Sequence, residues 1–313
     1  MITHAFVLGA GLGTRLRPLT EDLPKPLIPI FQKPLITFAL DHLIAAGVTS
    51  FIINTHHRAE AFEELFADRS YRGHPVRLVH EPEILGTGGG IKNIERWLEG
   101  QPFISYSGDL LTDVDLKPLL DTHFRAGNDV TIAVRKNGLR TDVAVEGDRV
   151  VDIANRYGHP GQFDFAGISV WTPAIFERIP AGQSLSYIPI LAEWISQGGR
   201  IGGVVSNGGK WFNIGSRTEY LAVHRTVEEE RWKPDYVSSP DWPIRIAADA
   251  QVDPTARLAG FCSIGAGCRV EAEAVLEDTI LWPGAQIASR SHLRNCIVRS
   301  RRKTEGNLSD TDI

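Results

Sequence analysis

The chain has 313 residues, of which 42% are hydrophobic and 23% are charged, and its formal net charge at pH 7 is −5. This composition is typical of a globular protein with room for two domains. The negative net charge and the lack of a strongly basic domain argue against nucleic acid as the main partner.

Membrane and secretory classes are disfavoured by the same sequence. No apolar run approaches the roughly 18 residues of a membrane span, and residues 1–6 lack the basic region of a signal peptide. The chain has three cysteines, without Cys-x-x-Cys spacing, which predicts neither a disulfide framework nor a zinc site. We therefore expect no membrane partner and a reducing, cytoplasmic compartment.

A glycine-rich motif follows the first apolar run, at residues 5–8, which is predicted to be a buried strand. Its glycines and cations are Gly9, Gly11, Gly13, Arg15, Arg17 and Lys25. Such glycines let the backbone approach a ligand closely and direct its N–H groups toward an anion. Four prolines then exclude a regular helix, so we expect an open loop as far as about Pro34 that can fold over a triphosphate.

Two other phosphate-binding motifs do not fit this stretch. A dinucleotide fingerprint would need its third glycine at Thr14 or Leu16, and the next predicted strand ends without a ribose-binding carboxylate. No Gly-x-x-x-x-Gly-Lys-Ser/Thr run occurs either. A nicotinamide-dependent oxidoreductase is therefore disfavoured.

The motif resembles the signature of sugar-1-phosphate nucleotidyltransferases. The residues that carry this resemblance are Gly9-x-Gly11-x-Gly13-x-Arg15-Leu16-x-Pro18-Leu19-Thr20 and Pro24-Lys25-Pro26-Leu27. The resemblance implies a Rossmann-like, GT-A-like α/β domain in which Arg15 and Lys25 are catalytic. It also implies nucleotide contacts from Leu8, Gly9, Ala10, Gly11, Leu12, Gly13 and Thr14.

Strands and helices alternate after this loop. Helices are predicted at 34–46, 60–66, 95–98 and 116–125, and strands at 50–54, 76–79 and 103–107. The alternation predicts a mostly parallel sheet covered on both faces. In such sheets ligands bind outside the carboxyl ends of the strands, where the glycine motif begins.

A second glycine run occupies residues 85–91, between a strand and a helix. Its backbone amides and carbonyls could face a flat ligand, although composition alone is equally consistent with a flexible connection. In the resembled family such a segment borders the nucleobase. The resemblance therefore implies nucleotide binding by Gly86, Thr87, Gly88 and Gly89.

Two further motifs point to a magnesium site. A carboxylate at Asp109 follows the fourth predicted strand, where it could bind Mg²⁺ together with substrate phosphates, whereas Asp113 and Asp115 are better suited to capping the next helix. The resemblance assigns the metal to Asp109, with catalytic importance. The run 211–216 resembles a family segment whose second metal-binding aspartate is replaced here by Asn213, so we expect weaker metal binding.

From residue 129 onward strands predominate. They are predicted at 130–134, 142–145, 150–153, 163–171 and 201–205, with helices at 173–177, 187–196 and 218–229. This predicts a mixed extension carrying the acceptor pocket. The run 163–168 resembles the family's sugar-contacting strand, which implies sugar-phosphate contacts from Phe165 and Gly167. The family's Glu-Lys-Pro motif is missing, and Arg156 is the nearest candidate cation.

A proline-rich linker at 233–244 separates a catalytic domain, 1–232, from a region with a different period. Large apolar residues recur there every six positions, with one slip of phase: Ile246, Val252, Leu258, Ile264, Val270, Leu276, then Leu281, Ile287 and Leu293. This period predicts a short parallel β-helix at 245–298, with the cysteines as small core residues. The resemblance implies a left-handed coil. A flexible tail is expected at 299–313, and open coil edges favour a homo-oligomer.

Together these motifs predict transfer of a nucleotidyl group from a nucleoside triphosphate to a sugar-1-phosphate, with Mg²⁺ and release of pyrophosphate. Within the family the coil favours a mannose-1-phosphate guanylyltransferase using GTP. The alternatives are a heptose-1-phosphate guanylyltransferase, an N-acetylmuramate-1-phosphate uridylyltransferase, and a catalytically weak regulatory subunit that binds a nucleotide sugar.

Overall fold

The computed structural model describes residues 2–313 and divides into two compact units. The first, which we call the sheet unit, comprises the residues up to Leu12 together with Ala39–Trp211. The second, the coil unit, comprises Gly13–Phe38 and Phe212–Ile313. These boundaries differ from the predicted division at residues 232–244, because residues 13–38 and 212–232 group with the C-terminal coils. Residues 2–313 contain no helix long and apolar enough to span a membrane.

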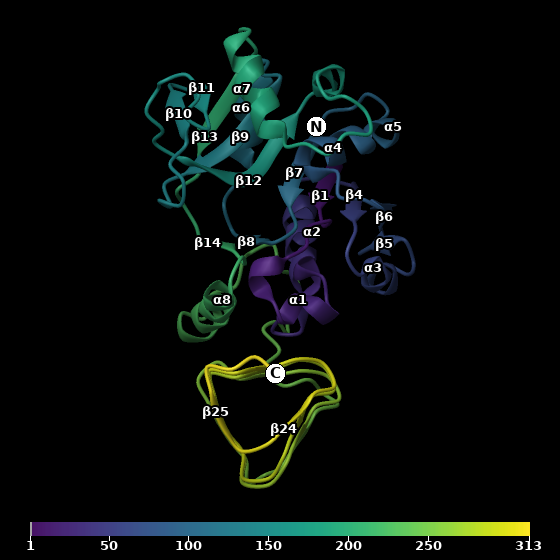
Figure 1. The fold of residues 1–313 in the computed structure, drawn as a ribbon, viewed down its shortest axis with the longest axis vertical. Helices are drawn as coiled ribbons and strands as arrows, with labels where there is room; N and C mark the ends of the chain where they lie inside the picture. Colours follow the sequence, from purple (N-terminus) through teal and green to yellow (C-terminus); the bar gives the residue numbers. More distant parts are fainter. Residues whose placement is uncertain (1) are drawn as a thin grey trace. The chain divides into compact units, whose positions relative to one another are not determined.

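Ten strands among the described residues of the sheet unit form one mixed sheet, in the order β10-β11-β13-β9-β12-β7-β1-β4-β6-β5 (Figure 1). Its central part is parallel from β7 through β1 and β4 to β6, while β12 runs antiparallel to both β7 and β9. The strands of this unit are β1 (His4–Leu8), β4 (Ser50–Thr55), β5 (Ser70–Tyr71), β6 (His74–His80), β7 (Phe103–Ser107), β8 (Leu110–Thr112), β9 (Val130–Arg135), β10 (Val143–Glu146), β11 (Arg149–Ile153), β12 (Asp164–Trp171) and β13 (Ile201–Val205). The predicted change from parallel to mixed pairing is confirmed.

The helices of the sheet unit bury apolar faces against this sheet. The helix α6, for example, packs on β9 and β13 and buries Leu119. It is capped at its C-terminal end by Gly127, whose φ of 57° lies in the left-handed region that favours glycine. The helical elements of this unit are α3 (Ala59–Leu65), α4 (Gly86–Asn93), α5 (Glu95–Leu98), α6 (Lys117–Ala126), η3 (Pro173–Glu177) and α7 (Tyr187–Ser196). A unit boundary lies within α2 (Leu35–Ala45) and within β14 (Trp211–Asn213).

The coil unit contains three parallel sheets whose strands stack from one coil to the next, seen as superposed triangles in Figure 1. The sheets are β15-β18-β21-β24, β16-β19-β22-β25 and β17-β20-β23. Their strands are β15 (Gln251–Val252), β16 (Arg257–Ala259), β17 (Ser263–Ile264), β18 (Arg269–Val270), β19 (Val275–Glu277), β20 (Ile280–Leu281), β21 (Gln286–Ile287), β22 (His292–Arg294), β23 (Ile297–Val298), β24 (Lys303–Thr304) and β25 (Asn307–Ser309). This confirms the predicted parallel repeat.

The register of these sheets explains the slip in the six-residue pattern. Val252 pairs with Val270, whereas Val270 pairs with Ile287, so the second step is one residue shorter than the first. Six of the large apolar residues, from Ile264 to Leu293, form one buried cluster with all three cysteines, and Val252 and Leu258 pack against it partly buried. Ile246 is 44% exposed, so the prediction of a core position is wrong for this first residue of the series. The three cysteines are buried, as predicted for core residues. Burial disfavours the charged thiolate and so raises the pKa of each thiol.

Residues 299–313 differ from the flexible tail expected for them. They contain β24 and β25, which pair in parallel with β21 and β22, and the main chain of Ile313 exchanges hydrogen bonds with Ile297 and Arg299. The polar composition is explained by the exposed outer faces of these strands, whereas Leu308 packs on the core of the coil.

The coil unit also includes residues 13–38, which contain the second part of the glycine motif, and the helix α8 (Arg217–Glu229). Its further elements are η1 (Thr14–Leu16), α1 (Leu19–Asp22), η2 (Lys25–Leu27), β2 (Pro29–Ile30) and β3 (Lys33–Pro34). The linker is packed rather than open, since Trp242 is buried and its indole N–H donates to the Ile30 carbonyl at 3.0 Å.

Candidate functional site

The carboxyl edge of the sheet brings the start of the first glycine motif, residues 8–12, beside the segment that leads to Asp109. Leu8 and Ser107 are register partners in the parallel pair β1 and β7, so the residues after them leave the sheet side by side. The N–H of Gly108 donates to the Leu8 carbonyl at 3.0 Å, and a Cβ at this position would lie only 2.5 Å from that oxygen. Glycine at 108 therefore lets Asp109 turn directly beside the start of the glycine motif.

A buried polar network joins the two glycine runs of the sheet unit. The side-chain oxygen of Asn54 accepts from the Gly9 N–H at 2.8 Å, and its amide nitrogen donates to Glu81 at 2.8 Å. The other oxygen of Glu81 accepts from the Leu85 N–H at 3.0 Å, immediately before α4. Asn54 and Glu81 are 2% and 1% exposed, so this network fixes both glycine runs from within. Sequence reasoning missed both residues.

The second glycine run, predicted to connect a strand and a helix, is itself helical and forms α4, Gly86–Asn93. Its glycines allow close packing on the segment 183–187, where a Cβ at Gly86 would lie 2.7 Å from the Leu185 carbonyl. The N–H groups of Gly88 and Gly89 both donate to that carbonyl, at 2.9 and 3.4 Å. These two amides therefore have a structural partner, and Thr87 also accepts a bond from the Tyr187 N–H.

The predicted acceptor residues lie in different settings. Gly167 adopts a φ of 81° at an irregularity in β12, and a Cβ there would lie 3.1 Å from the Ser107 hydroxyl. Phe165 packs edge-on against Tyr187 beside the core of the sheet unit. The side chain of Arg156 is exposed, and its N–H donates to Asp152, which also binds the next residues of that loop. Of the three, Gly167 lies nearest the strand that leads to Asp109.

Arg135 is a cation at the same edge that sequence reasoning missed. It ends β9, which runs parallel to β7 because both are antiparallel to β12. Its guanidinium lies 5.6 Å from the ring centroid of Trp211 and donates to the Ser206 carbonyl at 2.8 Å, while its Nε is buried with no hydrogen-bond partner in the described chain. Burial lowers the pKa of Arg135, although arginine stays charged at neutral pH.

The cations of the glycine motif lie in the coil unit. Instead of an open loop, residues 13–27 form three short helical turns, η1, α1 and η2. Gly13 adopts a φ of 61°, and its carbonyl accepts from the Thr20 hydroxyl and the Leu16 N–H, each at 2.9 Å. Arg15 is exposed, whereas Lys25 is buried.

Arg15 contacts Gly215, a residue of the 211–216 motif that lies with it in the coil unit. A Cβ at Gly215 would lie 2.9 Å from Arg15 Nη2, so the guanidinium packs directly on this glycine. Ser216 caps α8 in a reciprocal arrangement, because Glu219 donates its N–H to the Ser216 hydroxyl and accepts from it. Two residues before Gly215, the side-chain oxygen of Asn213 is buried without a hydrogen-bond partner among the described residues.

The family profile described as "Nucleotidyl transferase" matches residues 4–230 of the chain. The chain belongs to the nucleotidyl transferase family. More specifically, it is a sugar-1-phosphate nucleotidyltransferase, since its relatives act on several sugar-1-phosphates.

Two relatives and one solved structure illustrate the similarity. The chain is 31% identical to a mannose-1-phosphate guanylyltransferase of Mycobacterium tuberculosis, over 92% of this chain and 82% of the relative. It is 31% identical to an N-acetylmuramate α-1-phosphate uridylyltransferase of Neisseria meningitidis, over 68% of this chain and 93% of the relative. The inositol-1-phosphate CTP transferase of T. maritima shares the fold, with a TM-score of 0.59 and 22% identity over 70% of this chain and 91% of that one.

The nucleotidyl transferase has residues that fit Mg²⁺ in part. The amide oxygen of Asn213, for which residues 2–313 offer no hydrogen-bond partner, is the kind of hard ligand that Mg²⁺ prefers. Within residues 2–313 no group of three or more histidine, cysteine, aspartate or glutamate side chains could hold a metal. Mg²⁺ commonly binds through one or two protein ligands, substrate phosphates and water, so such a cage is not needed.

The two alternative carboxylates have other partners. Asp115 accepts from the Lys117 N–H at 2.8 Å at the start of α6, as expected for a capping residue. Asp113 instead accepts from the Lys210 N–H, just before β14. Both side chains therefore hold main-chain amides of the sheet unit in place.

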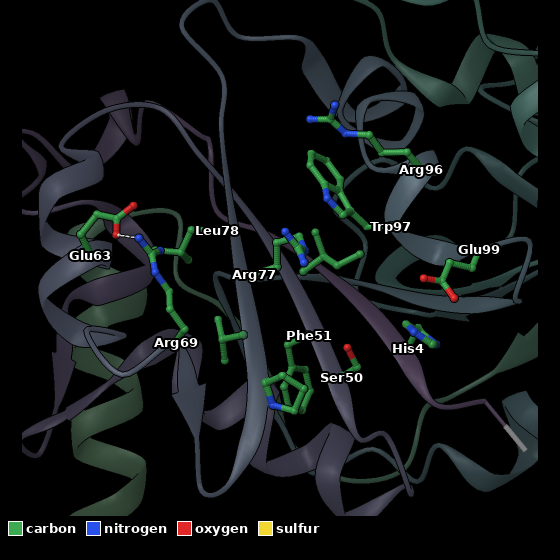
Figure 2. Close-up of a pocket in the computed structure, with 13 residues that line it drawn as sticks. His4, Ser50, Phe51, Glu63, Arg69, Arg77, Leu78, Arg96, Trp97 and Glu99 are labelled. Carbon is green, nitrogen blue, oxygen red and sulfur yellow. Dashed lines mark ion pairs between the residues drawn. The ribbon is translucent and has the colours of Figure 1, made fainter.

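A cavity of about 620 Å³ lies elsewhere in the sheet unit (Figure 2). Its lining includes His4 and Ser50, the first residues of β1 and β4, so it begins at the amino ends of these strands. Arg96 lies 4.0 Å from the ring centroid of Trp97 in its wall, and Arg69 pairs with Glu63. None of the residues predicted to bind substrate lines this cavity.

Proposed function

We propose that this nucleotidyl transferase transfers the guanylyl group of GTP to mannose 1-phosphate. The observation that best supports the transfer chemistry is the packing of Arg15 on Gly215. Gly215 is two residues from Asn213, whose buried side-chain oxygen has no hydrogen-bond partner in the described part of the chain. The choice of substrates is supported by the M. tuberculosis guanylyltransferase, whose similarity extends over 92% of this chain and so includes coil residues.

In the proposed reaction an oxygen of the sugar phosphate attacks the α-phosphorus of the triphosphate. The bond from the α-phosphorus to the oxygen that bridges it to the β-phosphate breaks, and pyrophosphate leaves with that oxygen. The nucleophile is already an anion at pH 7, so no general base is required. The residues of the enzyme must instead align two phosphate groups and stabilise their charge.

The residue roles follow from this requirement. Arg15 and Lys25 bind the triphosphate and stabilise the leaving pyrophosphate, and the backbone of residues 8–14 binds the nucleotide. Asp109 and Asn213 are the residues that would hold Mg²⁺, which when bound supplies charge neutralisation on the phosphates. For the acceptor phosphate, Arg135 is better supported than the exposed Arg156, because it ends a strand at the same sheet edge as Asp109.

The glycine run at Gly86–Gly89 keeps a proposed role beside the nucleobase, through the surface of α4 rather than through the amides of Gly88 and Gly89. Phe165 and Gly167 remain proposed parts of the sugar pocket, and a homo-oligomer remains a prediction that light scattering tests.

A substrate grid tests the proposed function. Purified protein with Mg²⁺ is given GTP or UTP together with mannose 1-phosphate, a heptose 1-phosphate or N-acetylmuramate 1-phosphate, and pyrophosphate is measured. We expect release with GTP and mannose 1-phosphate, none without the sugar phosphate, and a decrease of at least about 100-fold in Arg15→Ala and Asp109→Ala. The exposed coil variant Arg290→Ala is the control.

Other outcomes overturn the proposal in distinguishable ways. Release only with UTP and N-acetylmuramate 1-phosphate would assign the uridylyltransferase reaction instead, and release only with the heptose phosphate would change the acceptor. Tight binding of a nucleotide sugar with no turnover in any pair would assign the regulatory role.

A further inference from the structure

The segment that carries Arg15 and Lys25 is built on the coil unit. Residues 13–38 group with the coils by their contacts, and specific hydrogen bonds account for this grouping. The hydroxyl of Tyr220 donates to the Pro29 carbonyl at 2.6 Å and accepts from the buried indole N–H of Trp282 at 3.0 Å. Farther along, the side chain of Gln32 donates to the Ser263 hydroxyl at 3.0 Å.

Arg299 makes the most concentrated of these contacts. Its Nη1 donates to the Pro18 carbonyl at 3.0 Å and lies 3.2 and 2.9 Å from the carboxylates of Glu21 and Asp22. Its side chain is only 10% exposed, although both carboxylates remain partly hydrated. The three partners lie between Arg15 and Lys25 in the sequence, so one guanidinium holds the turn that separates the two predicted catalytic cations.

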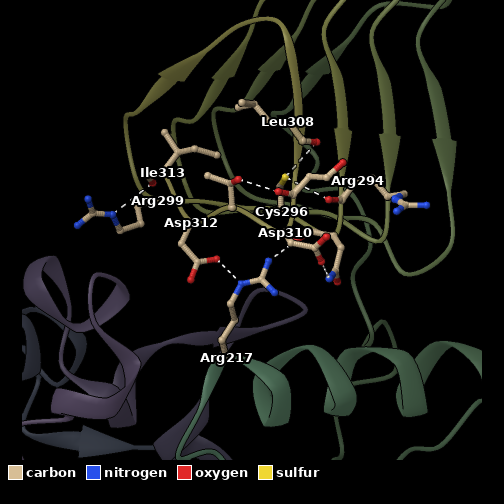
Figure 3. Close-up of polar contacts among 11 residues, drawn as sticks. Arg217, Arg294, Cys296, Arg299, Leu308, Asp310, Asp312 and Ile313 are labelled. Carbon is tan, nitrogen blue, oxygen red and sulfur yellow. Dashed lines mark hydrogen bonds and ion pairs between the residues drawn. The ribbon is translucent and has the colours of Figure 1, made fainter.

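The last residues of the chain hold Arg299 in place (Figure 3). Its Nε donates to the main-chain oxygen of Ile313 at 3.2 Å, and its own N–H donates to the same oxygen at 2.8 Å. Arg217, at the start of α8, fixes the neighbouring Asp312 through a bond of 2.7 Å and also donates to the Asn295 carbonyl. Residues 310–313 therefore complete the coil that carries Arg299.

We propose that Arg299 is a positioning residue for the triphosphate: through Pro18, Glu21 and Asp22 it holds α1 so that Arg15 and Lys25 keep their places. This inference rests on the proposed function of these two cations. Arginine suits the role because its planar fork donates in several fixed directions, which one lysine ammonium cannot reproduce. Small displacements of positioned charges reduce catalysis strongly, so loss of this contact affects the reaction without removing a group that touches substrate.

Four variants test the proposal in the full chain. Arg299→Ala removes the contact, Arg299→Lys keeps only its charge, and the double variant Glu21→Gln with Asp22→Asn removes the carboxylates while leaving Arg299 bound to Ile313. Arg290→Ala is the matched control, because this arginine also lies in the coil unit and pairs with Glu273 on the exposed surface.

Steady-state kinetics separate positioning from a general structural role. In Arg299→Ala we expect the KM for the triphosphate to rise about tenfold and kcat to fall, with an unchanged KM for the sugar phosphate. In the double variant we expect the KM for the triphosphate and kcat to change in the same direction. The values for Arg299→Lys should lie between those of the double variant and the wild type, and the values for Arg290→Ala should equal those of the wild type. Equal kinetic constants in all variants, or a lower melting temperature alone, would overturn the proposal.

Hydrogen exchange tests the same contact without any assumption about the reaction. The amides of Leu16, Glu21 and Leu27 are bonded within the short turns of residues 13–27. We expect faster exchange there in Arg299→Ala and in the double variant, and wild-type exchange in Arg290→Ala. Unchanged exchange in these variants would refute the positioning role, even if the wild-type protein is an active transferase. Faster exchange in the variants, combined with a wild-type protein that has no transferase activity, would support the contact and refute only the proposed function.

Discussion

Replacing Glu81 by glutamine isolates the network that joins the two glycine runs of the sheet unit. The two side chains are nearly isosteric, so the change leaves no cavity, but it replaces one acceptor oxygen with an NH₂ group. In the wild-type protein the Leu85 N–H and the Asn54 amide nitrogen donate to the two carboxylate oxygens of Glu81, at 3.0 and 2.8 Å. The new NH₂ group must face one of these two donors. Two donors facing each other in a site that is 1% exposed leave buried polar groups without partners.

An unsatisfied buried group costs about 1–3 kcal/mol, so we expect Glu81→Gln to lower the free energy of unfolding by about 2 kcal/mol. Urea denaturation measures this as a lower midpoint at an unchanged slope. The matched control is Glu83→Gln, because this substitution removes the same charge two residues away, at an exposed position. Equal midpoints for the two variants would refute the reasoning.

Three further predictions follow from the described contacts. Burial lowers the pKa of His42 and His224 to about 4. Between pH 6.5 and pH 4 each histidine therefore binds a proton in the unfolded chain but not in the folded one, which lowers the free energy of unfolding as the pH falls. Each should contribute a decrease of about 2 kcal/mol at pH 5 relative to pH 7, measured by urea denaturation at the two pH values. Unchanged stability would contradict this. Gly215→Ala should displace the Arg15 guanidinium and lower turnover at least about tenfold with a normal melting temperature; wild-type turnover would remove that contact from the account. The three buried cysteines should resist a thiol reagent in the folded protein and react in urea, whereas fast labelling without urea would show that the coil opens.

Much of the fold could be predicted because its elements carry local signals. The helix at Tyr187–Ser196 and the strand at Phe103–Ser107 were predicted with the bounds that the structure has. The coil was predicted from its repeated apolar residues, including the position of its phase slip. The helix at Gly86–Asn93 was missed because glycine has a low helix propensity and its glycines pack on residues 183–187, far along the chain.

The parts of the site that sequence could not predict depend on partners distant in the chain. Asn54 and Glu81 are single polar residues at the ends of strands, with no local pattern that marks them as a pair. Arg299 lies in a basic, polar run that is typical of a frayed terminus, and its partners Glu21 and Asp22 are hundreds of residues earlier. The motif residues themselves were recognisable because they are contiguous.

The central claim is that this chain moves a nucleotidyl group between phosphates, and the fate of labelled phosphorus tests it most directly. GTP labelled at the α-phosphorus is incubated with mannose 1-phosphate, Mg²⁺ and the purified protein, in parallel with GTP labelled at the γ-phosphorus. The account predicts that the α-label enters the sugar nucleotide and the γ-label enters pyrophosphate, in equal amounts. Release of the γ-label as inorganic phosphate, with no label in a sugar nucleotide, would contradict nucleotidyl transfer.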